Sequence, residues 1–383
     1  MIPQVNILIT KFPYHSRLSG VEKHTFQIVR HFQGRECKFF LMSSCSVMLS
    51  EFKKRGWNAK RWWLGLPPVN RFTKILFVLT WPAVEIMGLI GLVYFKRKYN
   101  TQKLYCLTLA DKLILTPLAR VLGYEVIWLE HLSLDPIVTK NVFKTVYKIY
   151  SRFVKIIAIS NFVRNQLAEM GIKNVEVIYH GVNIDQYYKQ ADIFEAMAEK
   201  RFAFERKNTF RIGCVSRLES LRGLEYLIKA VAILRKEFDD IDLVIVGEGS
   251  QREHLQWVAE QLGVDNDVKF VGYKDNFVDW ICDFDVFVLP SLRESLGLIL
   301  VEALAYGRPV IATNIGGIPE IIENNIGGVL VEPQNPRALA NAIYTLKRDP
   351  IRARELARAG REKIIEQFSL NKMLEEYKKI LVG

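Results

Sequence analysis

The chain has 383 residues, of which 50% are hydrophobic and 25% are charged. This length and composition exclude a disordered protein and suffice for two ordinary domains with substantial cores. The net charge of +12 is uneven, since residues 1–185 hold 26 Lys and Arg against 11 Asp and Glu, whereas residues 186–383 hold 27 against 30. The first half, at +15 (26 − 11), therefore faces something anionic, such as nucleic acid, an anionic membrane surface or a phosphorylated acceptor.

The cysteines and the first residues bear on the compartment. Five cysteines are scattered without a Cys-x-x-Cys pair. This pattern favours a reducing compartment over a disulfide framework or a zinc cluster, so we expect a cytoplasmic protein. The opening segment, MIPQVNILIT, lacks a basic region and carries Gln4 and Asn6 within its apolar run, which predicts a first strand and not a signal peptide.

Short β-branched runs alternate with longer stretches of helical period. In the first half they predict strands at 5–10, 37–42, 103–108, 124–129, 155–160 and 175–180. In the second half they predict strands at 211–216, 242–247, 268–272, 285–290, 309–313 and 327–332. Between strands, helical spacing is clearest for Leu224, Leu227, Ile228, Val231 and Leu234. The alternation predicts βαβ units and parallel sheets.

The strand rhythm stops between residues 183 and 209, where the chain becomes polar. We therefore expect two domains joined there. The expected parts are a basic first domain at 1–185, a linker at 186–209, a second domain at 210–370, and a final helix at 371–383 that packs back on the first domain.

Three features of the first half combine basic with apolar residues. Segment 75–95 is as long as a membrane span, but Pro82 and Glu85 lie in its middle, so we expect a buried or interfacial helical hairpin. Segment 53–63 interleaves basic residues with tryptophans. A third feature is a predicted basic helical stripe, formed by Lys140, Lys144, Lys148 and Arg152. Together they predict peripheral attachment to an anionic bilayer, at the inner face of the cell membrane.

Several turns between a strand and a helix carry glycine, which lets backbone N–H groups approach a phosphate. They are SGVEKH (19–24), VGEGS (246–250) and ESLGLIL (294–300). None has the G-x-G-x-x-G pattern, so a nicotinamide or flavin cofactor is not expected. The loop SRLESLRG sets Arg217 and Arg222 five residues apart after a strand, which predicts a pyrophosphate clamp, with surface ion pairs as the alternative.

In this order and spacing, SRLESLRG, VGEGS, PSLRESLGLILVEALAYGRPVIAT and GGIPEII resemble family 4 of the retaining glycosyltransferases. The resemblance continues in the first half through SGVEKH, EHLSLDP, IAISNFVRNQL and VIYHGVNID, so it covers nearly the whole chain. It implies the GT-B fold, an α/β architecture of two doubly wound Rossmann-like domains facing across a cleft. It also implies a nucleotide-sugar donor, with UDP or GDP as the expected nucleotide, and no further cofactor or metal.

The resemblance also assigns roles to residues. In that family the second glutamate of the Glu-x7-Glu motif, here Glu302, binds the ribose hydroxyls, and the first, here Glu294, lies beside the donor sugar. Arg217 and Arg222 are implied to neutralise the diphosphate leaving group. The backbone between the glutamates would face sugar and phosphate through Ser295, Leu296, Gly297 and Leu298.

Three more positions follow from the same resemblance. Gly247 of the VGEGS turn is expected beside the donor, and Gly20 is expected to close over the diphosphate from the other domain. His131 is expected near the acceptor and the sugar, with a core histidine as the alternative. Two departures concern the donor pocket: Arg222 stands where the family usually has lysine, and Ser295-Leu296 replaces the common Gly-Phe.

Asp283 and Asp285 form an Asp-x-Asp sequence, which binds a divalent metal in the other large glycosyltransferase fold. Here the pair immediately precedes a predicted strand, so we expect a structural role and an activity that survives chelation.

We therefore expect a retaining glycosyltransferase acting on a lipid-linked acceptor or a cell-envelope glycan, with no nucleic-acid partner. Two alternatives remain open. A nucleotide-sugar 2-epimerase shares the fold, and a non-catalytic membrane- or nucleic-acid-binding protein would explain the basic half. The second alternative leaves Glu294, Glu302 and the two arginines without a role.

Overall fold

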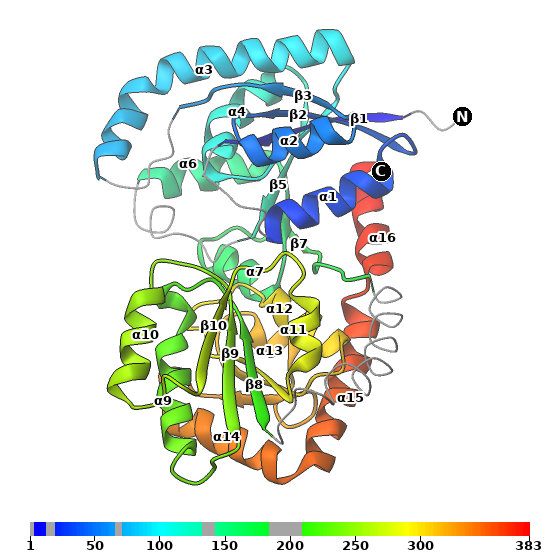
Figure 1. The fold of residues 1–383 in the computed structure, drawn as a ribbon. Coiled ribbons are helices and arrows are strands. Elements are labelled where there is room, and N and C mark those ends of the chain that lie inside the picture. The colour runs from blue at the N-terminus through cyan, green and yellow to red at the C-terminus, as the bar shows by residue number, and fades with distance from the viewer. Residues whose placement is uncertain (1–3, 13–19, 66–70, 132–141, 184–208) are drawn as a thin grey trace. The chain divides into compact units, whose positions relative to one another are not determined.

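The structure, a computed structural model, describes residues 4–12, 20–65, 71–131, 142–183 and 209–383 (Figure 1). Nearly all of the expected linker lies outside these residues, as does Lys140. The chain divides into two compact units, Met1–Tyr179 with Met373–Gly383 and His180–Lys372.

The first unit is built on a seven-stranded sheet in which every described strand pair is parallel. Across the sheet the strands are β3 (Asn58–Arg61), β2 (Cys37–Ser43), β1 (Val5–Lys11), β4 (Lys103–Cys106), β5 (Glu125–Glu130), β6 (Lys155–Ala158) and β7 (Val175–Val177). The central strands are buried because helices cover both faces, and this is why they read as continuous apolar runs. The six strands predicted for this half are confirmed.

One strand of this sheet was missed by the sequence analysis. β3 lies at the sheet edge and all four of its residues are exposed, so it has none of the apolar character by which the other strands were recognised. It falls within the segment in which basic residues and tryptophans alternate, and it therefore presents part of that segment on the surface.

Helices connect these strands. The described helices of the first unit are α1 (Gly20–Phe32), α2 (Ser46–Lys54), α3 (Arg71–Tyr99), α4 (Leu109–Val121), α6 (Val142–Tyr150), α7 (Asn161–Glu169) and most of α16 (Leu370–Leu381). Of the predicted basic stripe, Lys144 and Lys148 lie on α6, which ends before Arg152.

The expected helical hairpin at 75–95 is wrong, because this segment belongs to one continuous helix, α3. Pro82 lies inside the helix, where its ring removes one backbone hydrogen bond without ending it. Glu85 is accommodated on the flank of the helix, where it accepts a hydrogen bond from the Trp81 indole at 2.6 Å. α3 packs beside α4 in the first unit.

The second unit has a six-stranded parallel sheet. Its order is β10 (Val268–Gly272), β9 (Ile241–Val246), β8 (Phe210–Val215), β11 (Val286–Leu289), β12 (Val310–Thr313) and β13 (Val329–Val331). All six strands predicted for this half are confirmed. The order means that the chain builds outward from β8 in one direction and then returns to build outward from β11 in the other, which is the doubly wound arrangement.

Helices lie on both faces of this sheet (Figure 1). They are α9 (Leu224–Leu234), α10 (Arg252–Gln261), α11 (Val278–Asp283), α12 (Leu298–Ala305), α13 (Ile318–Ile321), α14 (Pro336–Arg348) and α15 (Pro350–Gln367). The predicted apolar face of α9 is confirmed, since its five periodic residues are at most 3% exposed and join the core beneath α10 and α14.

The final helix, α16, returns to the first unit from Met373 onward. The ring of Tyr377 is fully buried there, with its hydroxyl 3.3 Å from that of Tyr105 on β4. At the end of the helix, the Lys103 ammonium donates to the carbonyl of Ile380 at 2.9 Å, which places a cation at the negative end of the helix dipole.

Candidate functional site

The candidate site of the second unit lies where β8 and β11 run side by side. The chain leaves these two strands in opposite directions, and open α/β sheets bind ligands outside the carboxyl ends of the strands at such a point. The loop after β8 carries Arg217 and Arg222, and the loop after β11 carries Glu294. The fold thus brings together three predicted residues from segments some 70 positions apart in sequence.

The centre of the site is an ion pair between Arg222 and Glu294. The two side chains are only 21% and 13% exposed, so the pair is largely withdrawn from water. The Ser291 hydroxyl also donates to Glu294, at 3.2 Å. A backbone hydrogen bond of 2.8 Å from Leu292 to Leu221 joins the two loops directly, which fixes the arginine and the glutamate in register.

The protonation of Glu294 is perturbed by this environment. Burial raises the pKa of its carboxyl group, because the charged form loses hydration. The Arg222 charge, the Ser291 hydrogen bond and the Arg217 charge all act in the opposite direction without fully offsetting the burial. Loss of any of these groups would therefore raise the pKa of Glu294 further.

Arg217 is held quite differently from Arg222. Its side chain is 67% exposed and pairs with Glu219 at 2.7 Å. Exposed ion pairs of this kind contribute roughly 0–1 kcal/mol, so the guanidinium can exchange this partner for a ligand at little cost. The site therefore combines one fixed and one adaptable arginine.

A glycine pair braces the loop that carries Glu294. Gly316 has a φ of +55°, and a Cβ atom there would lie 1.8 Å from the carbonyl oxygen of Glu294. At Gly317 a Cβ atom would lie 2.3 Å from the carbonyl oxygen of Ser295. The buried Thr313 hydroxyl donates to the carbonyl of Ser291 at 2.5 Å. Together they support the glutamate loop from β12.

The expected site residue Gly247 has an analogous role beside the arginine loop. It has a φ of +146°, and a Cβ atom there would lie 1.8 Å from the carbonyl oxygen of Ser216. Backbone hydrogen bonds from Leu218 to Glu248 and from Gln251 to Leu218 hold the two loops together. The glycine is thus required for close backbone packing next to Arg217, and its contact with a ligand stays a prediction.

The remaining predicted residues of this unit lie on α12. Gly297 precedes the helix with a φ of +96°, and Leu296 is 1% exposed, so the turn is anchored in the core. The first N–H groups of a helix have no i−4 partner within it, and in α12 the N–H of Leu300 donates to the carbonyl of Gly297 at 2.8 Å. Glu302 is half-buried in the second turn, about 6 Å along the axis from Leu298.

Gly20 and His131 belong to the first unit. Gly20 is the exposed first residue of α1, and His131 directly follows β5. His131 is 7% exposed, and its ring lies edge-on to that of His24, with 6.2 Å between centroids. Most of the EHLSLDP motif that carried the prediction lies outside the described residues.

Sequence reasoning missed a buried polar network at the carboxyl edge of the first sheet. Lys11 pairs with Glu22, and Lys112 pairs with Glu130 at 2.6 Å. Asp111 accepts from the Thr10 hydroxyl at 2.8 Å. The sequence did contain a signal for this network, since each of Lys11, Asp111 and Glu130 is the first charged residue after a predicted apolar strand.

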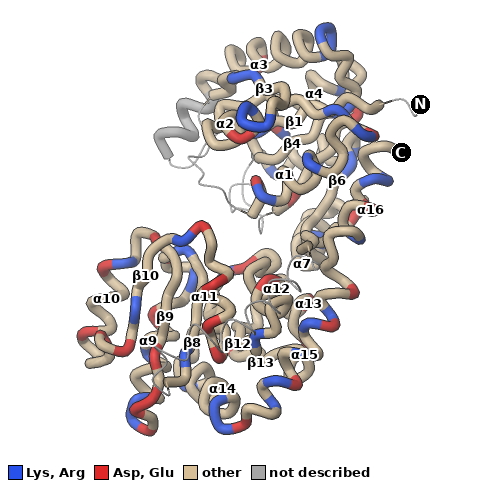
Figure 2. The backbone as a smooth tube through the Cα atoms, turned by 45° about the vertical axis from the view of Figure 1, so that its right-hand side comes forward, with Lys and Arg blue, Asp and Glu red and all other residues tan. Residues whose placement is uncertain are grey.

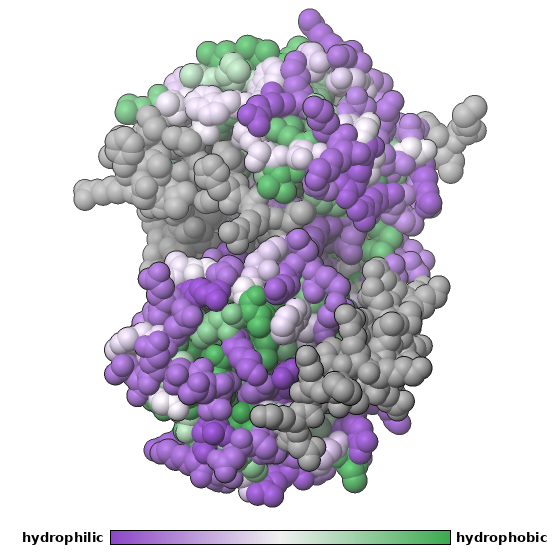
Figure 3. Space-filling model, viewed as in Figure 1, coloured by the Kyte–Doolittle hydropathy of each residue, from purple (hydrophilic) through white to green (hydrophobic). Residues whose placement is uncertain are grey.

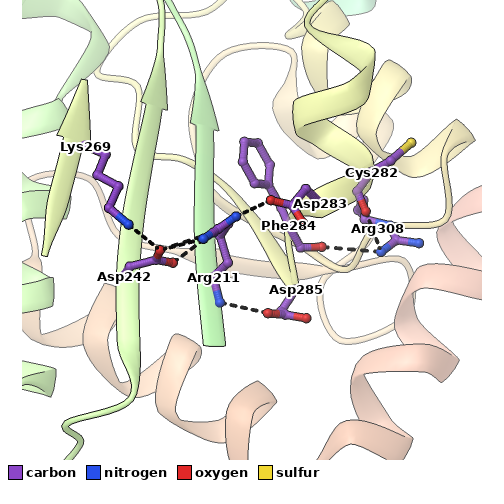
Figure 4. A network of polar contacts seen from close by, with 8 residues as sticks. All are labelled: Arg211, Asp242, Lys269, Cys282, Asp283, Phe284, Asp285 and Arg308. Atoms are coloured by element: carbon purple, nitrogen blue, oxygen red, sulfur yellow. Dashed lines mark hydrogen bonds and ion pairs between the residues drawn. The ribbon is translucent and has the colours of Figure 1, made fainter. Parts of the chain in front are cut away.

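The Asp-x-Asp pair lies at the opposite edge of the second sheet, and both aspartates contact Arg211 near the amino end of β8 (Figure 4). Asp283 pairs with its guanidinium, and Asp285 accepts from its backbone N–H at 2.7 Å. Asp242 completes the network with a contact of 2.9 Å to the same guanidinium. The carboxylates therefore tie β8 to β9 and to the end of α11. Among the residues that the structure describes, no group of three or more His, Cys, Asp or Glu could hold a metal ion.

Solved structures with this arrangement define the class of fold. A glycosyltransferase from Rickettsia africae matches with a TM-score of 0.81 and 24% identity, covering 99% of this chain and 98% of that one. HepE of Anabaena in complex with UDP-glucose matches with a TM-score of 0.80 and 20% identity, covering 99% of each chain. The protein therefore has the GT-B fold, as predicted.

The second unit also resembles a known family. Residues 195–363 match the model of the family described as Glycosyl transferases group 1, in agreement with the resemblance seen in the motifs of this part of the chain. Among curated relatives, an uncharacterized glycosyltransferase of Methanocaldococcus jannaschii is 30% identical over 204 residues, 53% of this chain and 52% of that one.

A second relative, the N-acetyl-alpha-D-glucosaminyl L-malate synthase of Bacillus anthracis, is 28% identical over 225 residues, 58% of each chain. The chain thus spans a little over half the length of these curated relatives.

Proposed function

We propose that this protein is a retaining glycosyltransferase that moves a sugar from a nucleotide-diphosphate sugar to a hydroxyl group. The observation that carries the proposal is the Arg222–Glu294 pair, with Arg217 beside it, at the strand switch of a domain that matches the group 1 family. Two cations next to a partly buried carboxylate suit a ligand that is anionic at one end and rich in hydroxyl groups at the other.

The arginines would bind the diphosphate. Arg222 is already fixed by Glu294, so little conformational entropy is lost when a phosphate oxygen adds to its free N–H groups. Arg217 would release Glu219 and swing to the second phosphate. Charge stabilisation by positioned groups of this kind is usually the largest contribution to the rate.

The carboxylates would bind hydroxyl groups. Glu294, with one oxygen engaged by Arg222 and Ser291, can accept from a sugar hydroxyl with the other. Glu302 on α12 can accept from the two ribose hydroxyls. Backbone N–H groups from Ser295 to Leu298 would complete the contact with sugar and phosphate.

The reaction exchanges one bond of the anomeric carbon for another on the same face. The bond from this carbon to the phosphate oxygen breaks as the bond to the acceptor oxygen forms, and the leaving phosphate takes the proton of the acceptor hydroxyl. Arg217 and Arg222 stabilise the negative charge that develops on the diphosphate.

The donor is proposed to be a UDP- or GDP-sugar. HepE of Anabaena is described in complexes with UDP and with UDP-glucose, and a relative from Mycobacterium tuberculosis, 31% identical over 221 residues, is described as GDP-mannose-dependent. The basic first unit supports a lipid-linked acceptor or cell-envelope glycan on the cytoplasmic side of the membrane, with Gly20 and His131 near the donor and acceptor.

The activity is proposed to need no metal, because the two arginines provide the positive charge at the diphosphate. Turnover should be the same in EDTA as in buffer alone. A complete loss of turnover in EDTA that manganese restores would overturn this part of the proposal.

The experiment that tests the function is a thermal-shift panel of UDP-, GDP- and ADP-sugars. A donor at 100 times its Kd stabilises the folded state by about 2.7 kcal/mol, which raises the melting temperature by several degrees. Arg222→Ala should abolish the shift, whereas Arg358→Ala, at an exposed position on α15, should keep it. If no donor shifts the wild type, the proposal is wrong, and if the donor is epimerised without acceptor, the protein is a 2-epimerase.

A further inference from the structure

Helix α3 has an inner face that is tightly bound to the first unit. Its inward residues Val84, Leu92 and Phe95 are at most 1% exposed. Two glycines allow an unusually close approach: a Cβ atom at Gly88 would lie 2.8 Å from a methyl carbon of Leu115, and one at Gly91 would lie 2.6 Å from the Met42 sulfur. The helix is therefore fixed in rotation about its own axis.

The outer face of α3 is apolar and exposed. Leu79 is 73% exposed, Ile86 60% and Ile90 51%. The spacing of these residues, continued by the half-buried Val93, repeats on one side of a helix, so they form a stripe about 21 Å long. Figure 3 shows hydrophobic side chains gathered where Figure 1 draws this helix. We call this surface the outer stripe, defined by Leu79, Pro82, Ala83, Ile86, Leu89, Ile90 and Val93.

A contiguous apolar surface of this kind indicates an interaction site. No residue that the structure describes covers it. A shallow hollow continues it toward the end of the helix, lined by Leu89, Ile90, Val93, Tyr94, Arg97 and Lys98. The hollow therefore joins apolar residues to cations along one continuous surface.

The border of the outer stripe is basic and aromatic. Lys96, Arg97 and Lys98 form the last turn of α3, and Figure 2 shows this positive charge together with that of β3. From β3, the Lys60 ammonium lies 3.7 Å from the centroid of the Tyr94 ring.

Tryptophans continue this border. The indole of Trp62 donates to the carbonyl of Met87 at 2.9 Å, and Trp63 is 49% exposed. Residues 58–64 and 86–100 contain no acidic side chain. Aromatic rings and cations around an apolar centre are typical of surfaces that lie at the headgroup level of a membrane.

The same geometry argues against two other occupants. A second copy of the chain, packed stripe against stripe, would bring the basic border of each copy into the same interface. A membrane span is also disfavoured, although Leu79–Tyr99 is long and apolar enough for one, because insertion would strip α3 of its inner contacts. An apolar stripe along one side of a helix held flat on a domain fits insertion parallel to the bilayer plane.

We propose that the outer stripe of α3 docks the first unit on an anionic bilayer, with its apolar side chains among the acyl chains and its cations at the lipid headgroups. This surface is independent of the donor site. The proposed function enters only as the reason for docking, because a glycosyltransferase bound to the bilayer would have access to a lipid-anchored acceptor.

The test is flotation of the full chain with vesicles of phosphatidylcholine alone or mixed with phosphatidylglycerol. The wild type should float with the mixed vesicles, and high salt or the neutral vesicles should reduce binding at least tenfold. The double substitution Ile86→Glu with Ile90→Glu should also reduce binding at least tenfold, and Arg97→Glu severalfold. Val121→Glu, at an 88% exposed position at the end of α4, is the matched control and should bind as the wild type.

The fold of each variant is checked by circular dichroism, and its donor binding is measured by the thermal shift. Loss of docking is thereby distinguished from failure of the proposed function. Flotation of the double variant equal to that of the wild type would overturn the proposal. Retention of the wild type in the membrane after an alkaline wash would also overturn it, because this result indicates a membrane span. A third contrary result is a protein that binds no vesicles and whose mass by light scattering falls from dimer to monomer in the double variant.

Discussion

At the scale of single residues, the site depends on a carboxylate that is expensive to bury. Glu294 is tolerated because Arg222 neutralises it and Ser291 donates to the same oxygen. Either partner left alone would be a poorly hydrated charge. The pair therefore links the two loops and also holds a cation and a carboxylate in fixed positions, where they can contact a ligand.

Arg222→Ala is expected to reduce turnover by orders of magnitude and to lower the free energy of unfolding by about 1–3 kcal/mol, since it leaves Glu294 without its cation. Adding Glu294→Gln should restore most of the stability and none of the turnover. Denaturation and steady-state kinetics measure the two effects. Near-normal turnover in Arg222→Ala, with Arg358→Ala as the control, would remove the proposed site.

Asp111 gives a prediction about pH. Burial raises the pKa of its carboxyl group from 3.8 to about 6. The folded first unit then binds this proton more tightly than the unfolded chain does, so its stability falls as the pH rises from about 4 to 6 and stays lower above that. The contribution is about 3 kcal/mol at most.

Asp111→Asn is expected to flatten the fall in stability between pH 4 and 6, as measured by denaturation of the first unit. Asn retains an acceptor for Thr10, so the fold should persist. The matched control is Asp239→Asn, at a fully exposed side chain, which should follow the wild-type profile. An unchanged profile in Asp111→Asn would contradict the burial argument.

At the scale of elements, the turns after the strands determine whether the site can form. The turn after β12 presses Gly316 against the carbonyl of Glu294. The φ of +55° at Gly316 favours glycine within its own turn, and the contact with Glu294 adds a second requirement that arises only when the two elements pack together.

Gly316→Ala is expected to lower turnover at least tenfold by displacing the Glu294 loop. Gly263→Ala is the matched control: it has a similar φ of +67°, but an added Cβ would meet nothing within 4 Å. Both variants carry the strain of a left-handed alanine, about 1–2 kcal/mol, and only the first carries the clash. Equal kinetics in the two variants would show that the contact does not position the glutamate.

The sequence predicts elements according to how they are buried. The strands were recognised because a parallel strand covered on both faces is apolar throughout. β3 was missed because it is exposed, and the segment of α3 was expected to be a buried or interfacial hairpin because Pro82 and Glu85 in its middle argued against a membrane span. The indole of Trp81 donates to Glu85 and so accommodates this carboxylate on the helix, and no sequence pattern predicts that contact.

The candidate site was predictable to a similar extent. Arg217, Arg222 and Glu294 follow strands and sit in motifs, so they could be named in advance. The supports could not, because Thr313 reaches Ser291 across 22 residues and acquires its role only when β11 and β12 pair. The position of Lys11 after an apolar strand was a signal in the sequence, but its pairing with Glu22 could not be predicted, since the two residues meet only after the first βα unit has folded.

At the scale of the whole molecule, the chain passes from the first unit to the second near residue 180 and returns near residue 373. The returning helix completes the first unit through Met373, Leu374, Tyr377, Ile380 and Leu381, each at most 4% exposed. The stability of the first unit therefore depends on residues beyond the second.

Tyr377→Ala is expected to destabilise the first unit by about 3–5 kcal/mol, as for other buried aromatic residues. Tyr377→Phe keeps the ring and loses only the hydroxyl contact with Tyr105, so its effect should be about 1 kcal/mol. Hydrogen exchange resolves the two units. Equal destabilisation of the second unit in Tyr377→Ala would show that the helix does not act on the first unit alone.

The path of α16 also has a consequence for biogenesis. On the ribosome, residues 373–383 emerge only after the whole second unit has been synthesised. Until then the first unit lacks α16, and the surface around Tyr105 that this helix covers is exposed. The second unit can already fold at that stage. A translation product that stops short of α16 would therefore contain a complete second unit and an incomplete first unit, and quality-control proteases would cleave it in its amino-terminal portion.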